Sequence, residues 1–201
     1  MSNSPKVIVF DAFGTLVKIG NSRSPYLKLM KWQKQSGRKP TSKDANIIMS
    51  TNANLSQISN LFGNEIPVNL LAELNADLTL NLDSIELYSD TVVVLQTLKN
   101  RGFKLALCSN LAMPYGEKLK KILPDLFDEL ILSYEIGSIK PDIKIYEAIQ
   151  MRLNYDMKDI LFIGDNEILD VEKPRSLGMS ARLIQRNEAQ TLNDVLKDIL
   201  D

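Results

Sequence analysis

Polar side chains that could do chemistry follow three apolar runs of the chain, each at the point where the run ends. Asp11 comes directly after Val7–Phe10, and Ser109 and Asp165 stand at the ends of two later runs. A continuous apolar run bounded by turn residues is typical of a buried strand. Because ligands collect at the carboxyl ends of the strands in an open α/β sheet, we expect these side chains to share one edge.

Two of these side chains are carboxylates, and their meeting predicts a cation. Asp11 and Asp165 brought close together would repel, and one of them would have its pKa raised unless a cation lay between them. The chain contains no histidine, which excludes Ser-His-Asp catalysis and histidine metal sites. A ligand set made only of oxygen suits Mg²⁺ better than zinc. Asp170 follows Asp165 by about one helical turn, a distance that lets it support the metal or orient the water molecules bound to it.

Further polar residues complete the predicted site. Lys140, just before Pro141, offers a positive charge to an anionic substrate or to Asp11. Ser109 offers a hydroxyl donor, and Asn110 offers backbone or amide donors. Taken singly, each of these residues is more easily explained as an ordinary turn or surface residue. Their order at successive strand ends favours a site instead.

Composition narrows the class of protein. The chain has 201 residues, 44% of them hydrophobic, and a formal net charge of −1, so it suits one core domain and lacks the clustered basic surface of a nucleic-acid-binding protein. Its single cysteine, Cys108, allows no internal disulfide and suits a reducing compartment. No apolar run is long enough to cross a bilayer, and the first residues do not resemble a signal peptide. We therefore expect a soluble cytoplasmic protein that binds neither nucleic acid nor membrane. The positive charge of Lys140 favours a small, anionic molecule as its partner. The sequence leaves its oligomeric state open.

Hydrophobic periodicity predicts an α/β protein. The expected strands are Lys6–Phe10, Phe103–Cys108, Leu126–Ser133, Asp159–Ile163 and Ser180–Ile184. The expected later helices are Thr91–Asn100 with Asp90 as its cap, Pro114–Leu123, Ile143–Arg152, a stretch around Pro174–Leu177, and a last helix capped by Thr191 and ending at Leu200. Strands that alternate with helices favour a parallel sheet covered on both faces.

The segment between the first two strands has a different pattern. From about Lys18 to Leu87 the sequence shows only helical periodicity and loops. Helices are expected to begin at Pro25, at a cap formed by Thr41 or Ser42, at Leu55 and at Pro67. The segment is either a helical lobe inserted into the core or a long crossover packed on the sheet. We favour the lobe, because a crossover needs only a dozen or more residues.

The ordered set of these residues resembles the haloacid dehalogenase superfamily over essentially the whole chain. The four motifs that carry the resemblance are Asp11-Ala12-Phe13-Gly14-Thr15, Ser109, Lys140 in SIKPD, and Gly164–Asp170. The resemblance implies a Rossmann-like parallel-sheet core at residues 1–17 and 86–201, with an inserted α-helical cap at residues 18–85.

The same resemblance assigns roles to the site residues. Asp11 is implied as a covalent nucleophile, with Thr15 and Ser109 holding the substrate or the nucleophile and Lys140 neutralising charge. Asn110 and Gly14 are expected to bind the substrate. Mg²⁺ is expected on Asp11, Asp165 and the backbone carbonyl of Phe13.

Phe13 is where the sequence departs from the phosphatases of the superfamily. Those enzymes carry a second Asp two residues after the nucleophile, which protonates the leaving oxygen and later activates water. Phe13 can do neither, and general acid–base help is typically worth ~10²–10⁴ in rate. A substrate with a good leaving group, such as an acyl or aryl phosphate, would lose least. Glu167 is considered as a substitute acid.

The 2-haloacid dehalogenases of the superfamily offer a second interpretation. They resemble this chain at DAFGTL and at Tyr146, and a halide leaves without a proton. They use no metal, however, and carry a Ser where this chain has Asp165 and an Asn where it has Glu167. They also use a cap arginine, for which only Arg23 and Arg38 are available. We favour a Mg²⁺-dependent phosphohydrolase acting through an aspartyl-phosphate on a small phosphorylated metabolite. The alternatives are a metal-free dehalogenase and a catalytically weakened binding relative.

Overall fold

A five-stranded parallel sheet forms the centre of the molecule. The computed structural model describes residues 5–20 and 23–201, so residues 1–4 of the predicted core and 21–22 of the predicted cap lie outside the description. The strands stand in the order β5-β4-β1-β6-β7, and every neighbouring pair is parallel. Their bounds are β1 (Val7–Phe10), β4 (Lys104–Ser109), β5 (Glu129–Leu132), β6 (Ile160–Gly164) and β7 (Ser180–Leu183). The predicted α/β parallel core is confirmed.

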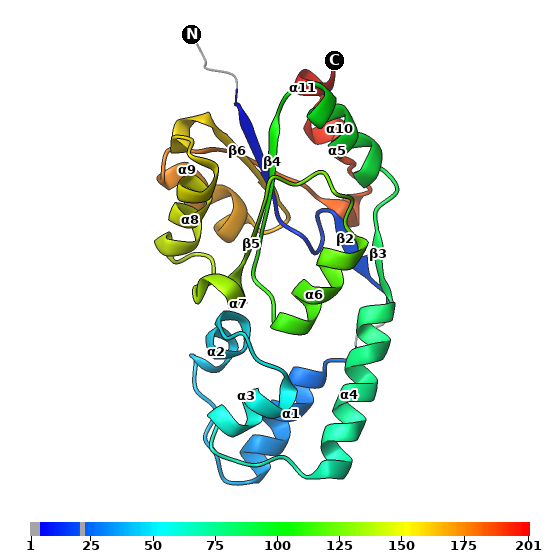
Figure 1. Ribbon diagram of the computed structural model, residues 1–201, viewed down its shortest axis with the longest axis vertical. Coiled ribbons are helices and arrows are strands. Elements are labelled where there is room, and N and C mark those ends of the chain that lie inside the picture. The colour runs from blue at the N-terminus through cyan, green and yellow to red at the C-terminus, as the bar shows by residue number, and fades with distance from the viewer. Residues whose placement is uncertain (1–4, 21–22) are drawn as a thin grey trace.

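Helices cover both faces of this sheet. Alternate residues of β1 enter opposite hydrophobic clusters, with Ile8 and Phe10 on one face and Val7 and Val9 on the other. Figure 1 shows two groups of helices on opposite sides of the sheet. One group comprises α5 (Thr91–Asn100), α10 (Leu192–Val195) and α11 (Lys197–Leu200), and the other comprises α8 (Ile143–Leu153) and α9 (Lys173–Ser176). Both faces of β1 are therefore shielded from solvent, which explains its uninterrupted apolar sequence.

Four helices between β1 and β4 form a lobe at one end of the molecule (Figure 1). They are α1 (Pro25–Gln35), α2 (Asp44–Ser50), α3 (Leu55–Leu61) and α4 (Val68–Asp83). Their apolar side chains, among them Leu29, Ile58 and Leu74, pack into a hydrophobic cluster separate from those of the sheet. This packing favours the inserted lobe over a crossover, and the boundary of the cap at residues 18–85 stays a prediction.

An antiparallel pair of short strands joins the lobe to the core. β2 (Val17–Ile19) pairs with β3 (Ile85–Leu87), with Val17 opposite Leu87. The expectation of helices and loops alone from Lys18 to Leu87 was therefore wrong at both ends. Strands of three residues are too short to show an alternating pattern. Their pairing brings the two connections of the lobe side by side.

Two helix caps predicted from the sequence have different outcomes. Neither Thr41 nor Ser42 caps α2, which has Lys43 at its N-cap, because the carboxylate of Asp44 accepts hydrogen bonds from Thr41 and Arg38 instead. The predicted cap of the final helix is confirmed, since Thr191 forms a reciprocal capping box with Asp194.

Other strands and helices begin or end a few residues from the predicted limits, and two helical segments were not predicted. α6 covers Met113–Ile122, and β4 extends one residue further than predicted, so that Ser109 is its last residue. The chain turns helical again at α7 (Ser133–Ile136) directly after β5, and a π-helical segment at Glu167–Glu172 precedes α9. The final helix is divided into α10 and α11 at Leu196. Among the residues that the structure describes, no helix has the length and apolar character needed to span a bilayer.

Candidate active site

Asp11 lies at the carboxyl end of the central strand β1. Its backbone N–H donates to the Ile163 carbonyl of β6 at 2.8 Å, and its side chain is almost fully buried. The following loop turns back on itself because the N–H groups of Leu16 and Val17 both donate to the carbonyl of Ala12. The sequence prediction that Asp11 stands at the active edge of the sheet therefore agrees with its position.

Gly14 allows this loop to approach Asp165. The backbone of Gly14 has φ +74°, and a Cβ added there would lie 2.1 Å from Oδ2 of Asp165. Any side chain at this position would be strained and would displace the carboxylate. Gly14 thus makes room for Asp165, and its predicted contact with substrate stays a prediction.

Lys140 is buried between two carboxylates. Its Nζ lies 2.8 Å from Oδ1 of Asp11 and 2.6 Å from Oδ1 of Asp170, and it also donates to the Cys108 carbonyl at 3.0 Å. Burial by itself lowers the pKa of the Lys140 ammonium, but Asp11 and Asp170 outweigh that effect and raise the pKa above its usual range. Lys140 is therefore a fixed positive charge beside Asp11, as the sequence predicted.

The side chain of Asn110 holds the backbone of Lys140 in place. Its amide Nδ2 donates to the Lys140 carbonyl at 2.8 Å, and its Oδ1 accepts from the Lys140 N–H at 2.7 Å. The carboxamide thus clamps the backbone of Lys140 with both of its polar atoms. The second N–H of the amide and the backbone of Asn110 are not used in these contacts, and the binding of substrate by Asn110 stays a prediction.

Three carboxylates meet around Lys140. Asp11, Asp165 and Asp170 each offer an oxygen atom, and these oxygens lie within 4.8 Å of one another. Burial, followed by the charges of Asp11 and Asp170, raises the pKa of Asp165 to about 6. Burial also raises the pKa of Asp170, although Lys140 opposes it. One ammonium is not enough to balance three carboxylates, so the cluster fits a hard divalent cation held by oxygen.

The predicted metal ligands are placed unequally in this cluster. Within the described part of the chain, Asp165 forms no ion pair, which leaves it available to a metal. Asp170 is paired with Lys140 and accepts from the Asn166 N–H at 3.1 Å, which suits a supporting position. The carbonyl of Phe13 as a ligand stays a prediction.

The two hydroxyl groups predicted to act on the substrate are both buried at this edge. Ser109 ends β4, the strand next to β1, and is 1% exposed. Thr15 is fully buried, and its Oγ1 has no hydrogen-bond partner among the described residues. A buried hydroxyl without a partner is costly unless something outside the chain satisfies it. Thr15 is therefore suited to a ligand oxygen.

Arg186 supports the loop after Asp11, a contact that the sequence did not indicate. Its guanidinium donates to the Thr15 carbonyl at 2.7 and 3.1 Å and forms a bidentate pair with Asp90 at 2.8 and 3.0 Å. Asp90 stands at the N-cap of α5, as predicted, but its carboxylate makes no capping bond and faces Arg186 and the Leu192 N–H instead. No local pattern connects residues so far apart in the sequence.

Two residues considered for a dehalogenase, Tyr146 and Arg38, make contacts that hold the fold together. The Tyr146 hydroxyl donates to the Leu169 carbonyl at 2.6 Å, and its ring packs against Phe162. Arg38 of the lobe is bound to Asp44 at 2.6 and 2.8 Å and lies over the ring of Phe62. Arg23 and Glu167 are exposed. Arg38 and Tyr146 are therefore bound to other parts of the protein, whereas the roles considered for Arg23 and Glu167 stay predictions.

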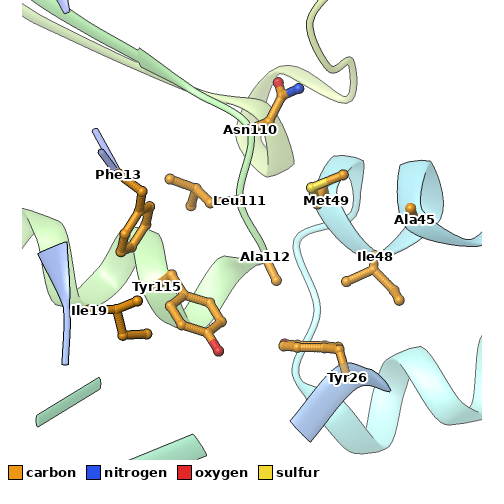
Figure 2. A pocket seen from close by; sticks show the side chains of 10 residues that line it. All are labelled: Phe13, Ile19, Tyr26, Ala45, Ile48, Met49, Asn110, Leu111, Ala112 and Tyr115. Carbon is orange, nitrogen blue, oxygen red and sulfur yellow. The ribbon is translucent and has the colours of Figure 1, made fainter. Parts of the chain in front are cut away.

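An apolar pocket of about 420 Å³ opens between the lobe and the core next to this site (Figure 2). Its residues come from the loop after β1, from β2, α1 and α2, and from the start of α6 with the residues before it. They are Phe13, Ile19, Tyr26, Ala45, Ile48, Met49, Asn110, Leu111, Ala112 and Tyr115. Pockets of this size between two structural units are common binding sites for small molecules.

Comparison with known proteins agrees with this geometry. The sequence model of the protein family of haloacid dehalogenase-like hydrolases matches residues 5–178 of this chain. The chain is 33% identical over 107 residues to a glyceraldehyde 3-phosphate phosphatase of Methanopyrus kandleri, covering 52% of this chain and 46% of that relative. The chain thus spans about half the length of that curated relative.

Solved structures share the fold over almost the whole chain. A HAD phosphatase of Thermococcus onnurineus has a TM-score of 0.61 and 25% identity, with 96% of this chain and 95% of that one covered. A HAD family enzyme of Bacteroides thetaiotaomicron, solved with magnesium and inorganic phosphate, has a TM-score of 0.62 and 17% identity, with coverages of 90% and 95%.

Proposed function

This chain belongs to the haloacid dehalogenase-like hydrolases, and from that membership we propose that it is a Mg²⁺-dependent phosphohydrolase acting on a small phosphorylated molecule. The observation that carries the proposal is the cluster of three carboxylates around Lys140 beside the end of β1. Without a cation, Asp165 beside Asp11 would repel any anionic substrate. With Mg²⁺ on these oxygens, the same cluster attracts a phosphate.

In this proposal Asp11 is the nucleophile. Lys140 holds Oδ1 of Asp11, so we assign the attack on phosphorus to Oδ2. The new bond joins Oδ2 to phosphorus, and the bond from phosphorus to the leaving oxygen breaks, which gives an aspartyl-phosphate. Water then attacks that phosphorus and releases inorganic phosphate, which restores the carboxylate.

The other residues stabilise the charge that builds on the phosphoryl oxygens. The hydroxyls of Thr15 and Ser109 donate hydrogen bonds, and the Lys140 ammonium neutralises negative charge from inside the protein. Asp11, Asp165 and the Phe13 carbonyl would hold Mg²⁺, with Asp170 in support. When bound, the metal supplies Lewis-acid polarisation of the phosphoryl group.

Relatives support the class of reaction and leave the substrate open. Phosphatases are among both the similar sequences and the similar structures. Another similar structure, the HAD family enzyme of Bacteroides thetaiotaomicron, was solved with magnesium and inorganic phosphate. The substrate named for the Methanopyrus kandleri relative is that protein's own. A cytoplasmic location is part of the proposal, because the single cysteine, Cys108, is buried and unpaired.

One observation favours a dehalogenase as a second candidate. Phe13 stands where a general acid would be needed for poor leaving groups, and halide ions leave without a proton. The geometry weakens this candidate, because an unneutralised Asp165 lies beside Asp11, and Arg38 of the lobe is bound to Asp44. A binding protein without turnover is the third candidate.

One assay separates these candidates. The purified protein receives p-nitrophenyl phosphate or (S)-2-chloropropionate, each with Mg²⁺ or with EDTA. We expect phosphate release that needs Mg²⁺ and disappears in Asp11→Asn, while the exposed control Asp156→Asn keeps it. Halide release that survives EDTA would overturn the proposal. Inactivity of a folded protein in all four mixtures would favour the binding protein.

A further inference from the structure

The apolar pocket beside the site is placed to receive whatever is attached to the phosphate. Phe13 lines the pocket and stands two residues after Asp11, and Asn110 lines it and clamps the backbone of Lys140. Figure 2 shows the side chains of the core and those of α2 facing each other across the pocket. A phosphate bound at Asp11 would therefore direct its ester group toward these side chains.

Aromatic rings make up much of the pocket wall, with Phe13 and Tyr115 on the side of the core and Tyr26 of α1 on the side of the lobe. The rings of Phe13 and Tyr115 meet edge to face with centroids 6.0 Å apart, and Tyr26 lies 6.4 Å from Tyr115. The opposite wall from α2 consists of Ala45, Ile48 and Met49. Sugars and other polyols would find few polar partners there, whereas a flat aromatic ring would gain apolar and edge-to-face contacts.

Two hydroxyl groups are the main polar atoms among these rings, and they differ in their partners. The Tyr115 hydroxyl accepts a hydrogen bond from Asn81 at 3.1 Å. The Tyr26 hydroxyl is buried and has no partner within the described part of the chain. Burial, with a smaller effect of Tyr115, raises the pKa of Tyr26, so this phenol stays protonated. It is a donor that an oxygen atom of a bound molecule would satisfy.

Among the described residues that line this pocket, none carries a carboxylate, an ammonium or an imidazole. The Tyr26 phenol can donate a hydrogen bond, but because burial raises its pKa it does not give up its proton. A leaving oxygen in the pocket therefore departs with its electron pair as an anion. Oxygen anions of this kind are stable when an aromatic ring delocalises the charge. The shape of the pocket and its lack of an acid thus favour the same leaving group.

We propose that this pocket selects aryl phosphate monoesters, with the aryl ring between Phe13, Tyr26 and Tyr115 and the phosphate at Asp11. The proposal rests on the phosphohydrolase function above. Oδ2 of Asp11 forms a bond to phosphorus while the bond from phosphorus to the aryl oxygen breaks, and the electron pair leaves on a phenolate. The phenolate takes its proton from water afterwards, and a second water hydrolyses the aspartyl-phosphate.

Substrates that differ in one property at a time test this selection. With Mg²⁺ present, we compare 1-naphthyl phosphate, acetyl phosphate and glycerol 3-phosphate. Naphthyl phosphate has an apolar ring, acetyl phosphate has a good leaving group without a ring, and glycerol 3-phosphate has neither. We expect kcat/KM for naphthyl phosphate to exceed that for acetyl phosphate at least tenfold, and that for glycerol 3-phosphate at least a thousandfold. Equal values for the naphthyl and acetyl esters would overturn the selection of a ring.

Filling the pocket gives the matched test. Ala45 is an exposed residue of α2 that lines the pocket, so Ala45→Phe narrows it without disturbing the core. We expect this variant to lower the ratio of naphthyl to acetyl phosphate kcat/KM at least tenfold. Ala76→Phe makes the same change on an exposed position of α4 outside this pocket and should leave the ratio unchanged. A ratio that does not fall in Ala45→Phe contradicts the proposal.

Binding separates failure of this inference from failure of the proposed function. Calorimetry of Asp11→Asn measures the affinity for 1-naphthyl phosphate and for inorganic phosphate without turnover. One outcome is that no substrate is hydrolysed, that naphthyl phosphate binds at least tenfold more tightly than phosphate, and that adding Ala45→Phe to Asp11→Asn removes this difference. The pocket assignment then stands and the phosphohydrolase function fails. If esters are hydrolysed without a preference for the ring, the function stands and the pocket assignment fails.

Discussion

Replacing Lys140 by methionine tests the electrostatics of the site most directly. Methionine keeps most of the length and apolar volume of lysine but removes the ammonium. That ammonium contacts Asp11 at 2.8 Å and Asp170 at 2.6 Å, and Asp165 lies in the same cluster. Lys140→Met therefore leaves three carboxylates together with no positive charge from the protein among them.

The expected loss of stability follows from these distances. With an effective dielectric constant of about 20, unit charges at 2.6–2.8 Å attract by about 6 kcal/mol per pair. Desolvation of the buried charges offsets much of this attraction, and breaking a buried ion pair by removing one partner costs about 3–5 kcal/mol. We expect the free energy of unfolding of Lys140→Met to fall by that amount in EDTA. Loss of one preorganised positive donor should also lower kcat about 10²–10³-fold.

Magnesium should compensate for the missing ammonium. A cation bound to the three carboxylates replaces the lost charge, so adding Mg²⁺ should raise the free energy of unfolding more in Lys140→Met than in the wild type. Urea titrations with Mg²⁺ and with EDTA measure both values, and Lys158→Met, at an exposed lysine, is the control. The reasoning is refuted if Lys140→Met is as stable as the wild type in EDTA, or if Mg²⁺ stabilises the two proteins equally.

Three further predictions concern other contacts of the site and the core. Asp165→Asn should abolish phosphate release and the stabilisation of the protein by Mg²⁺. In EDTA this variant should be at least as stable as the wild type, because the repulsion between Asp165 and the other two carboxylates is removed. A lower stability in EDTA would contradict this. Arg186→Met breaks a buried bidentate pair with Asp90 and should cost about 3 kcal/mol of unfolding free energy, whereas the exposed Arg101→Met should cost less than half as much. Burial raises the pKa of Asp128, but hydrogen bonds from Lys99, Lys104 and the Leu105 N–H outweigh it and lower the pKa to about 2. Since the unfolded value is about 3.9, the stabilisation by Asp128 is fully present above pH ~4 and is lost as the pH falls towards 2, so a wild-type advantage of about 2 kcal/mol over Asp128→Asn in urea titrations at pH 7 should vanish at pH 2.

The central sheet and its active edge could be predicted because their signals are local. Each strand is a short apolar run, and the residue that ends it decides what stands at the edge. Asp11 and Ser109 are identified in this way, with strand limits that shift by one residue at β4. Lys140 and Asp170 follow from the motif order, and the structure places Lys140 in contact with Asp11 and Asp170 in the same carboxylate cluster.

Contacts between distant segments could not be predicted in the same way. The β2–β3 ladder joins strands of three residues on either side of the lobe, and neither strand has an alternating pattern long enough to recognise. Asn110 reads as a turn residue, and only the fold shows that it clamps Lys140. Arg186 and Thr15 are likewise connected by tertiary packing alone.

Phe13 connects the chemistry of the leaving group to its shape. An alkyl phosphate needs a proton on its leaving oxygen, and a missing general acid costs it ~10²–10⁴ in rate. The same side chain packs edge to face on Tyr115 and gives the pocket an aromatic wall, which has few polar partners for an alkyl polyol. An aryl ester does not need the missing general acid, and its ring gains contacts with the aromatic wall, so both effects favour it. Selectivity between these two ester classes therefore depends on position 13 more than on the carboxylate cluster, because Asp11, Lys140 and Asp165 act on the phosphoryl group that all such esters share.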